Sequence, residues 1–213
     1  MLSVKQLSIG GYDNNFAYFL ADTGSRQVYV VDPDNFPLLE NEINEYGYEP
    51  IGVLITHSHF DHLSGTPEFV GKYKVPVLIH KNAQEKSSLK NLDGVEIKFL
   101  EDDDDIVLGE EMIRVIHTPG HIDDAVCYKG DGWIITGDTL FVGACGRADL
   151  EGSNAGDLYE SLQKLAKLPG ETKVYPGHDY GEKPISTIAW EKEHNKYLLC
   201  KTFKEFRTLR LGC

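Results

Sequence analysis

The chain has 213 residues, of which 41% are hydrophobic and 26% charged, and its 21 Lys and Arg against 34 Asp and Glu give a formal net charge of −13. This composition is typical of a folded globular protein and excludes the disordered and fibrous classes. The negative charge argues against nucleic acid as a partner, because binding it requires Lys and Arg to neutralise phosphates.

The sequence also bears on location and domain count. No apolar run approaches the roughly 18 residues that a membrane span needs, and the first residues, 1–5, do not resemble a signal peptide. The four cysteines lack C-x-x-C spacing, which fits a reducing compartment. We therefore expect a cytoplasmic protein with no membrane partner, folded as a single domain over 1–213.

Strand and helix patterns alternate along the chain. Short β-rich runs predict strands at 4–9, 16–21, 27–31, 51–55, 75–79, 95–100, 113–116, 126–129 and 133–136. Apolar residues at helical spacing predict helices at 36–46, 66–73, 157–168 and 186–197, with the basic segment 201–210 as a continuation of the last one. The alternation predicts an α/β fold.

An acidic run at 101–105 separates two of the expected strands. A cation site is one interpretation of such a run. However, the run lacks the glycine and the spaced ligands of a calcium loop. We therefore expect a solvated loop.

A dense group of metal-ligand residues follows the expected strand 51–55. Three imidazoles and a carboxylate fall within six consecutive residues, namely His57, His59, Asp61 and His62. Imidazole nitrogen and carboxylate oxygen are ligands that suit zinc, iron or manganese. A hydrophilic loop with coincidental histidines is the alternative, but this pattern is much longer than a lone H-x-H. The segment predicts a metal site.

Three further segments place a candidate ligand near the end of an apolar strand, and the candidates are His121, Asp138 and His178. Both histidines follow a Pro-Gly pair, in which Pro fixes φ and Gly accepts a positive φ. We expect these turns to present the two imidazoles on a stiff backbone. Taken singly, each residue could be an ordinary turn residue. Four strand-end sites together favour one metal centre.

These residues resemble the ligand pattern of the metallo-β-lactamase fold superfamily, and the match extends from about Asn14 to Leu198. The resemblance implies an αββα sandwich with the metal site at one edge of the two sheets. It implies a first metal held by His57, His59 and His121 and a second held by Asp61, His62 and His178. Asp138 would bridge the two ions, and His117 would lie just behind the ligands.

The chemistry that this resemblance implies is hydrolysis. Two divalent ions, expected to be zinc with iron or manganese as alternatives, and two carboxylates leave a charge of about +2, which favours an anionic substrate. Metal coordination lowers the pKa of water to about 7, so that hydroxide is available at neutral pH. Asp61 and Asp138 are the candidate catalytic residues, with Asp61 orienting the hydroxide.

Within the superfamily, residues 13–18, 30–33, 137–141 and 145–147 resemble glyoxalase II, which hydrolyses thioesters of glutathione. The resemblance implies that Arg147 and Tyr180 contact the thiol part of the substrate. Only 35 residues follow His178, so the separate C-terminal helical domain of glyoxalase II is not expected here. We expect a small anionic thiol-derived substrate.

The alternative within the superfamily is a glutathione persulfide dioxygenase, which residues 145–149, 175–181 and 186–195 resemble. That resemblance implies one Fe(II) held by His57, His121 and Asp138, with open positions for oxygen and sulfur. Ala148, Ile122 and Gly177 depart from the usual residues of that family. Both alternatives keep all seven ligands, so the sequence does not determine whether one or two metal ions bind.

Other interpretations are weaker. A secreted β-lactamase would carry a signal segment, a nuclease would carry less negative charge, and a purely structural metal would need no open coordination position. Phe60 and Phe141 line the site or pack in the core, and Cys145 is expected to be a packed residue rather than a nucleophile. The segment 201–210 can pack on its own domain, mediate a homo-oligomer or reach a neighbouring site.

Overall fold

The structure is a computed structural model that describes residues 1–10 and 13–212. The chain divides into two compact units, Met1–Val115 and Ile116–Cys213, each with its own strands, helices and apolar core. None of the helices in the described residues combines the length and the hydropathy that crossing a membrane requires.

The first unit contains a mixed sheet with the strand order β1-β2-β3-β4-β5-β6. Its strands are β1 (Leu2–Ser8), β2 (Phe16–Asp22), β3 (Gln27–Val31), β4 (Glu49–Leu54), β5 (Val77–His80) and β6 (Ile97–Leu100). The pairs β1–β2 and β2–β3 are antiparallel, whereas β3 to β6 run parallel. Every residue of β2 is buried, as expected for a strand in the interior of a sheet.

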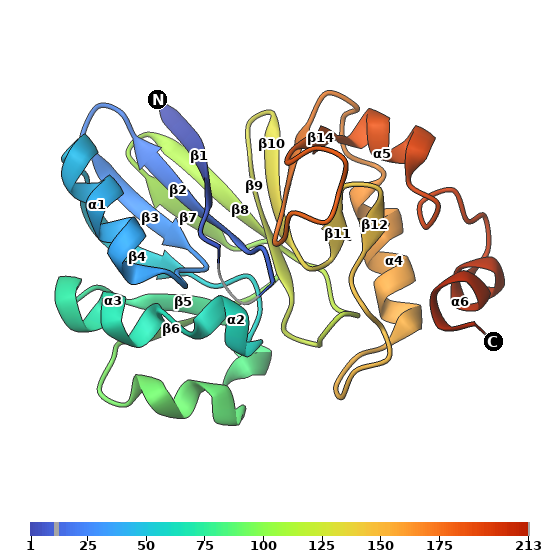
Figure 1. The fold of residues 1–213 in the computed structure, drawn as a ribbon, viewed down its shortest axis with the longest axis horizontal. Coiled ribbons are helices and arrows are strands. Elements are labelled where there is room, and N and C mark those ends of the chain that lie inside the picture. The colour runs from blue at the N-terminus through green and yellow to red at the C-terminus, as the bar shows by residue number, and fades with distance from the viewer. Residues whose placement is uncertain (11–12, 213) are drawn as a thin grey trace. The chain divides into compact units, whose positions relative to one another are not determined.

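Helices of the first unit connect its parallel strands (Figure 1). They are α1 (Phe36–Tyr46), α2 (Phe60–Leu63) and α3 (Thr66–Tyr73), and the 3₁₀ segments are η1 (Lys81–Ala83) and η2 (Ser87–Leu92). α1 begins at the Asn35 cap and ends at Gly47, which adopts the left-handed conformation that terminates helices. Buried residues of α1 and α3 join those of the strands in one core, which supports the backbone after β4.

A hairpin of β7 (Asp105–Leu108) and β8 (Glu111–His117) ends the first unit, and β8 carries the chain into the second. The acidic run precedes this hairpin. Its exposed carboxylates form ion pairs, Glu101 with Lys81 and both Asp103 and Asp105 with Arg114. The run is therefore a solvated loop up to residue 104, as predicted, and β7 begins at its last residue.

The second unit has the strand order β14-β13-β10-β9. Its strands are β9 (Val126–Gly130), β10 (Trp133–Gly137), β13 (Lys173–Pro176) and β14 (Ser186–Thr187), with a separate pair β11 (Leu140–Phe141) and β12 (Ala144–Cys145). Its helices are α4 (Ala155–Leu165), α5 (Ile188–His194) and α6 (Phe203–Leu211). Leu158, Leu162 and Leu165 of α4 are fully buried in the core of this unit.

The expected elements agree with the structure at β3, α1 and α3, whose bounds are the same. The C-terminal expectation was wrong in detail, because residues 186–187 form β14 and the basic segment folds as a separate helix. Asn195 ends α5 with an extended backbone, and Thr202 caps α6 by accepting from the Glu205 amide. A capping threonine starts a new helix rather than continuing the previous one.

Candidate metal centre

The loop after β4 is organised by a buried carboxylate, Asp32, which follows β3. Its two oxygens accept from the Thr56 amide (2.8 Å) and the Thr56 hydroxyl (2.6 Å). The Nδ1 atom of His62 also donates to Asp32, over 2.8 Å. Because β3 and β4 are neighbouring parallel strands, their ends meet at the same edge of the sheet. Asp32 therefore fixes the backbone and one imidazole of the histidine motif.

The first cluster brings together the four candidate ligands of the first unit. The Nε2 atom of His57 lies 3.0 Å from Nδ1 of His59, and Nε2 of His62 lies 3.5 Å from Asp61. Asn15 donates to the Asp61 carboxylate over 3.0 Å and to its backbone carbonyl over 3.2 Å. His57 and His62 are buried. Converging imidazole and carboxylate atoms of this kind suit a divalent transition metal.

Proton positions on His62 favour metal binding. Since Asp32 accepts a hydrogen bond from Nδ1, the proton of the neutral ring resides there and Nε2 keeps a lone pair. A carboxylate behind a histidine ligand is a common arrangement in metal sites, where it fixes both the tautomer and the ring orientation. The residues of the first cluster therefore fit a metal ion in their donor chemistry.

The second cluster brings together the three candidate ligands of the second unit. Nε2 of His121 lies 3.4 Å from one oxygen of Asp138, and Nε2 of His178 lies 3.3 Å from the other. All three residues are buried. Nδ1 of His121 donates to the backbone carbonyl of Arg147 over 3.0 Å, so Nε2 is the atom left for a metal. Each oxygen of Asp138 thus faces a different imidazole.

The backbone around His121 is held by a close approach to α4. Gly120 has φ of +135°, and a Cβ atom there would lie 2.2 Å from the backbone of Leu158. The Gly120 carbonyl accepts from the Asn154 amide, and the Ser161 hydroxyl donates to the Pro119 carbonyl. The expected Pro-Gly turn is therefore present here, and glycine is required for both its conformation and its contact.

The expectation of the same turn at Gly177 was wrong in its backbone conformation, because Gly177 does not have a positive φ. Its amide donates to the Gly137 carbonyl over 2.8 Å, which continues the pairing of β13 with β10. His178 therefore follows the end of β13, after a bend at Gly177. Gly137, just before Asp138, instead has a positive φ of 47°.

Gly146 adjoins the second cluster directly. A Cβ atom at this position would lie 2.0 Å from the Asp138 carbonyl oxygen and 3.0 Å from Cβ of His121. We expect Gly146→Ala to lower the free energy of unfolding by about 1–3 kcal/mol and to reduce metal content. Urea unfolding and metal analysis check this. Gly71→Ala, in a helix where nothing lies within 4 Å, is the control and should be neutral or slightly stabilising.

Aromatic rings flank His178. The Tyr180 ring stacks on its imidazole at 4.8 Å between centroids and 2° between planes, and Phe141 contacts both rings edge-on. Tyr180 is 46% exposed, whereas Phe141 is buried. The predicted substrate-binding residue Tyr180 is thus next to a candidate ligand, and Phe141 supports the pair. In the first unit, Phe60 is 60% exposed.

A buried polar network supports the segment that carries Phe141. Glu191 accepts from the Gly143 amide (3.0 Å) and from the Asn195 side chain (2.8 Å), and the Ser186 hydroxyl also donates to it. Burial raises the pKa of the Glu191 carboxyl, although these hydrogen bonds act in the opposite direction. Asn195 in turn donates to the Ala144 carbonyl over 2.9 Å. The network fixes the β11–β12 turn.

Three other sequence-predicted residues have defined surroundings. The guanidinium of Arg147 is exposed and pairs with both oxygens of Asp149, at 2.9 and 3.1 Å, which raises the pKa of Arg147 and lowers that of Asp149. Burial raises the pKa of the Cys145 thiol to about 12, so Cys145 is a packed residue as expected. His117 donates to the Asp123 carbonyl over 2.9 Å.

The chain is similar to proteins of one known family along most of its length. A family model described as the metallo-β-lactamase superfamily matches residues 11–178. A hydroxyacylglutathione hydrolase of Aliivibrio fischeri (strain MJ11) is 36% identical over 200 residues, covering 93% of this chain and 74% of the relative. The probable polyketide biosynthesis zinc-dependent hydrolase PksB of Bacillus subtilis (strain 168) is 30% identical over 204 residues, covering 91% of this chain and 87% of the relative.

A solved structure is also similar. The crystal structure of ETHE1 from Myxococcus xanthus matches with a TM-score of 0.84 and 29% sequence identity, covering 99% of this chain and 92% of that one. Together with the family model, this match confirms the metallo-β-lactamase fold, an α/β fold, that the sequence predicts.

Proposed function

Because the chain belongs to the metallo-β-lactamase superfamily, we propose that it hydrolyses a small thioester with the help of two divalent metal ions. In this reaction water adds to the thioester carbonyl carbon, the carbon–sulfur bond breaks, and a carboxylic acid and a thiol leave. The resemblance to hydroxyacylglutathione hydrolase supports a thiol such as glutathione. The similarity to PksB, which is described as a probable zinc-dependent hydrolase, supports zinc as the metal.

The observation that carries this proposal is the arrangement around Asp138. Its two oxygens face two different imidazoles, at 3.4 and 3.3 Å, which is the arrangement expected of a carboxylate shared between two ions. A single-metal oxygenase needs only one of these contacts. We therefore favour the hydrolase over the dioxygenase.

In this proposal the two clusters act together. One ion would be held by His57, His59 and His121, and the other ion by Asp61, His62 and His178. Asp138 would be a ligand of both ions. Bound there, the ions would lower the pKa of water to about 7 and polarise the substrate carbonyl. Within the chain, Asp61 is the catalytic residue that orients the attacking water, and Asn15 holds its carboxylate in place. Asp32 and the Arg147 carbonyl keep His62 and His121 in the ligating tautomer.

The persulfide dioxygenase remains the second candidate because of the similarity to the ETHE1 structure. In that case His57, His121 and Asp138 would hold one Fe(II). The metal content of protein purified without added metal and under exclusion of oxygen separates the two. Two equivalents of zinc, iron or manganese with hydrolysis of S-lactoylglutathione support the hydrolase. One iron with oxygen uptake on glutathione persulfide contradicts it.

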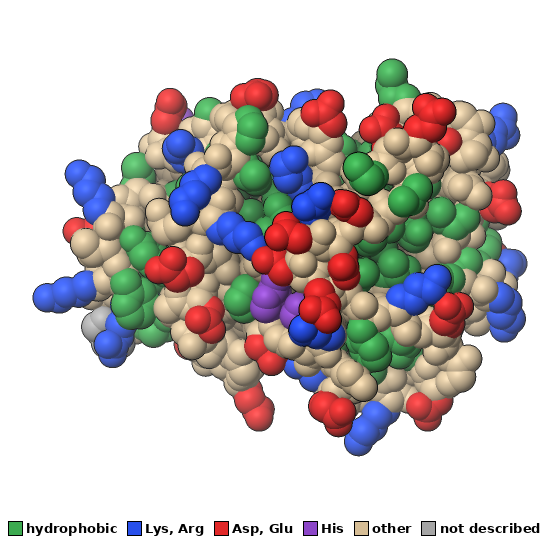
Figure 2. Space-filling view, turned by 180° about the vertical axis from the view of Figure 1, so that it is seen from behind, with side chains coloured by type: hydrophobic (Ala, Val, Ile, Leu, Met, Phe, Trp, Pro, Cys, Tyr) green, Lys and Arg blue, Asp and Glu red, His purple; other side chains and the backbone are tan. Residues whose placement is uncertain are grey.

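The partner in this proposal is a small anionic thiol derivative, and the location is the cytoplasm. On the face shown in Figure 2, Lys and Arg side chains lie among Asp and Glu, which supports a small substrate over a nucleic acid.

Arg147 is proposed to anchor a carboxylate of the thiol. Its guanidinium already pairs with Asp149, so the substrate would replace or share that partner. We expect Arg147→Ala to raise KM about tenfold for a carboxylate-bearing thioester, with kcat and metal content little changed. Asp149→Ala, which releases the Arg147 guanidinium from its ion pair, should leave KM unchanged from the wild type or lower it. Steady-state kinetics check both, and an unchanged KM in Arg147→Ala would exclude this anchor.

A further inference from the structure

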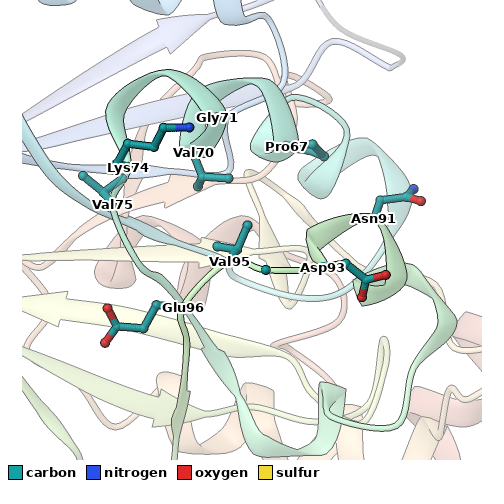
Figure 3. A pocket seen from close by; sticks show the side chains of 10 residues that line it. Pro67, Val70, Gly71, Lys74, Val75, Asn91, Asp93, Val95 and Glu96 are labelled. Carbon is teal, nitrogen blue, oxygen red and sulfur yellow. The ribbon is translucent and has the colours of Figure 1, made fainter.

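Two cavities adjoin each other on the first unit, along α3 and η2. The larger one, of about 470 Å³, is lined partly by charged side chains, including Lys74, Asp93 and Glu96 (Figure 3). Pro67 and Asn91, which lie towards one end of it in Figure 3, also line the second cavity, of about 220 Å³. The second cavity has a different chemistry.

The smaller cavity is lined without a charged side chain, although 26% of the residues in the chain are charged. Its apolar walls come from Phe60 and Leu63 of α2, Pro67 of α3 and Leu92 of η2. A carboxylate or ammonium group buried there would lose its hydration without an ionic partner, which is costly. The cavity therefore suits an uncharged group and excludes the charged thiol part of a glutathione conjugate.

The position of this cavity links it to the reacting bond. Phe60 and Leu63 belong to α2, and the same helix carries Asp61 and His62 of the first cluster. Four helical residues span only about 6 Å. Phe60 and Leu63, three residues apart, share one face of α2, and Asp61 and His62 share the other. A group seated in the cavity therefore reaches the proposed ligands around the exposed edge of α2, where Phe60 is 60% exposed and the Asp61 side chain 25% exposed. Phe60, whose ring is exposed, stands between the candidate ligands His59 and Asp61 in the sequence.

One hydroxyl in the lining adds a polar feature. The Ser88 Oγ atom is buried and has no hydrogen-bond partner among residues 1–10 and 13–212. A buried hydroxyl without a partner is uncommon and gains from a ligand that supplies one. A hydroxyl or keto oxygen on the bound group would serve this purpose.

We propose that this cavity binds the acyl group of the thioester, and that the preferred acyl group is uncharged, medium in length and substituted with a hydroxyl or keto oxygen. At about 30 Å³ for each non-hydrogen atom, the cavity holds roughly seven such atoms, which exceeds a lactoyl group. This proposal rests on the proposed hydrolase function, because the acyl group is defined by that reaction.

The first experiment compares kcat/KM for glutathione thioesters with acetyl, butanoyl, hexanoyl and 3-hydroxyhexanoyl groups. The wild-type enzyme is expected to prefer hexanoyl over acetyl at least tenfold, since each methylene in an apolar pocket contributes to specificity. Asn91→Trp, which fills the cavity from an exposed position, should lower the hexanoyl-to-acetyl ratio about tenfold. Lys90→Trp, on the same 3₁₀ segment but outside the cavity lining, should leave it unchanged.

The hydroxyl is tested separately. Ser88→Ala should reduce the preference for 3-hydroxyhexanoyl over hexanoyl by about fivefold or more, without changing the hexanoyl-to-acetyl ratio. An acyl-length profile that is flat in the wild type, or that Asn91→Trp leaves unaltered, would overturn the proposal.

A binding measurement keeps this result distinct from a failure of the proposed function. Hexanamide, an uncharged mimic of the acyl group, should bind the wild-type protein saturably at millimolar concentration in calorimetry, and Asn91→Trp should weaken this binding about tenfold. If hexanamide binds in this way but no thioester is hydrolysed, the cavity is confirmed as a binding site and the proposed hydrolase function is wrong. If hydrolysis occurs but neither hexanamide binding nor acyl-length selectivity is found, the cavity proposal is wrong and the hydrolase stands.

Discussion

Asp138→Ala is expected to abolish thioester hydrolysis, with a fall in kcat/KM of at least about a thousandfold. The carboxylate of Asp138 lies within 3.4 Å of His121 and 3.3 Å of His178, one oxygen toward each ring. Its removal deprives both proposed ions of a shared ligand and removes a negative charge that offsets theirs. The metal content should therefore fall from two equivalents to one or fewer, as measured by elemental analysis of the purified variant.

The matched control is Asp131→Ala, which removes an exposed carboxylate from the same unit, in the turn between β9 and β10. This variant should keep both its metal and its activity. The prediction would be contradicted by an Asp138→Ala protein that retains two equivalents of metal and hydrolyses thioesters at a rate close to that of the wild type. In that case Asp138 would be a structural residue.

The parts of the site that could be predicted from the sequence are those where ligands follow strands at short spacing. His57, His59, Asp61 and His62 are within six residues, so a single loop after β4 brings them together. The strands β1 to β6 and β8 to β10 and the helices α1 and α3 were also predictable, because their apolar periodicity is local, whereas β7, β11, β12 and β14 were not expected. The C-terminal residues were harder, since a cap residue, Thr202, and not periodicity decides where α6 begins.

Residues that act from a distance in sequence were not assigned a role from the sequence. Asp32 lies 30 residues before His62, and its contact arises only because β3 and β4 pair in the sheet. The Arg147 carbonyl behind His121 is a backbone group, which no residue pattern marks. Glu191 supports the β11–β12 turn through Gly143, 48 residues earlier. The residue pattern around Asp32, Val-Val-Asp-Pro, was the only available signal for the first of these.

Asp32→Ala tests the most consequential of these contacts. The variant leaves the Thr56 amide, the Thr56 hydroxyl and Nδ1 of His62 without their shared acceptor. We expect metal affinity to fall about 10- to 100-fold and the free energy of unfolding of the metal-free protein to fall by about 1–3 kcal/mol. Competition with a chelator measures the first quantity, and urea unfolding in the presence of that chelator measures the second.

A second substitution separates charge from shape. Asp32 has φ of 50°, a left-handed conformation that Asn tolerates as well as Asp does. Asp32→Asn keeps one acceptor but places an amide N–H₂ toward either Thr56 or His62, so it should keep most of the stability and lose part of the metal affinity. Asp93→Ala, an exposed carboxylate of the same unit, should change neither. If Asp32→Ala binds metal as tightly as the wild type, His62 is held by other contacts, and Asp32 serves only the fold of the loop after β4.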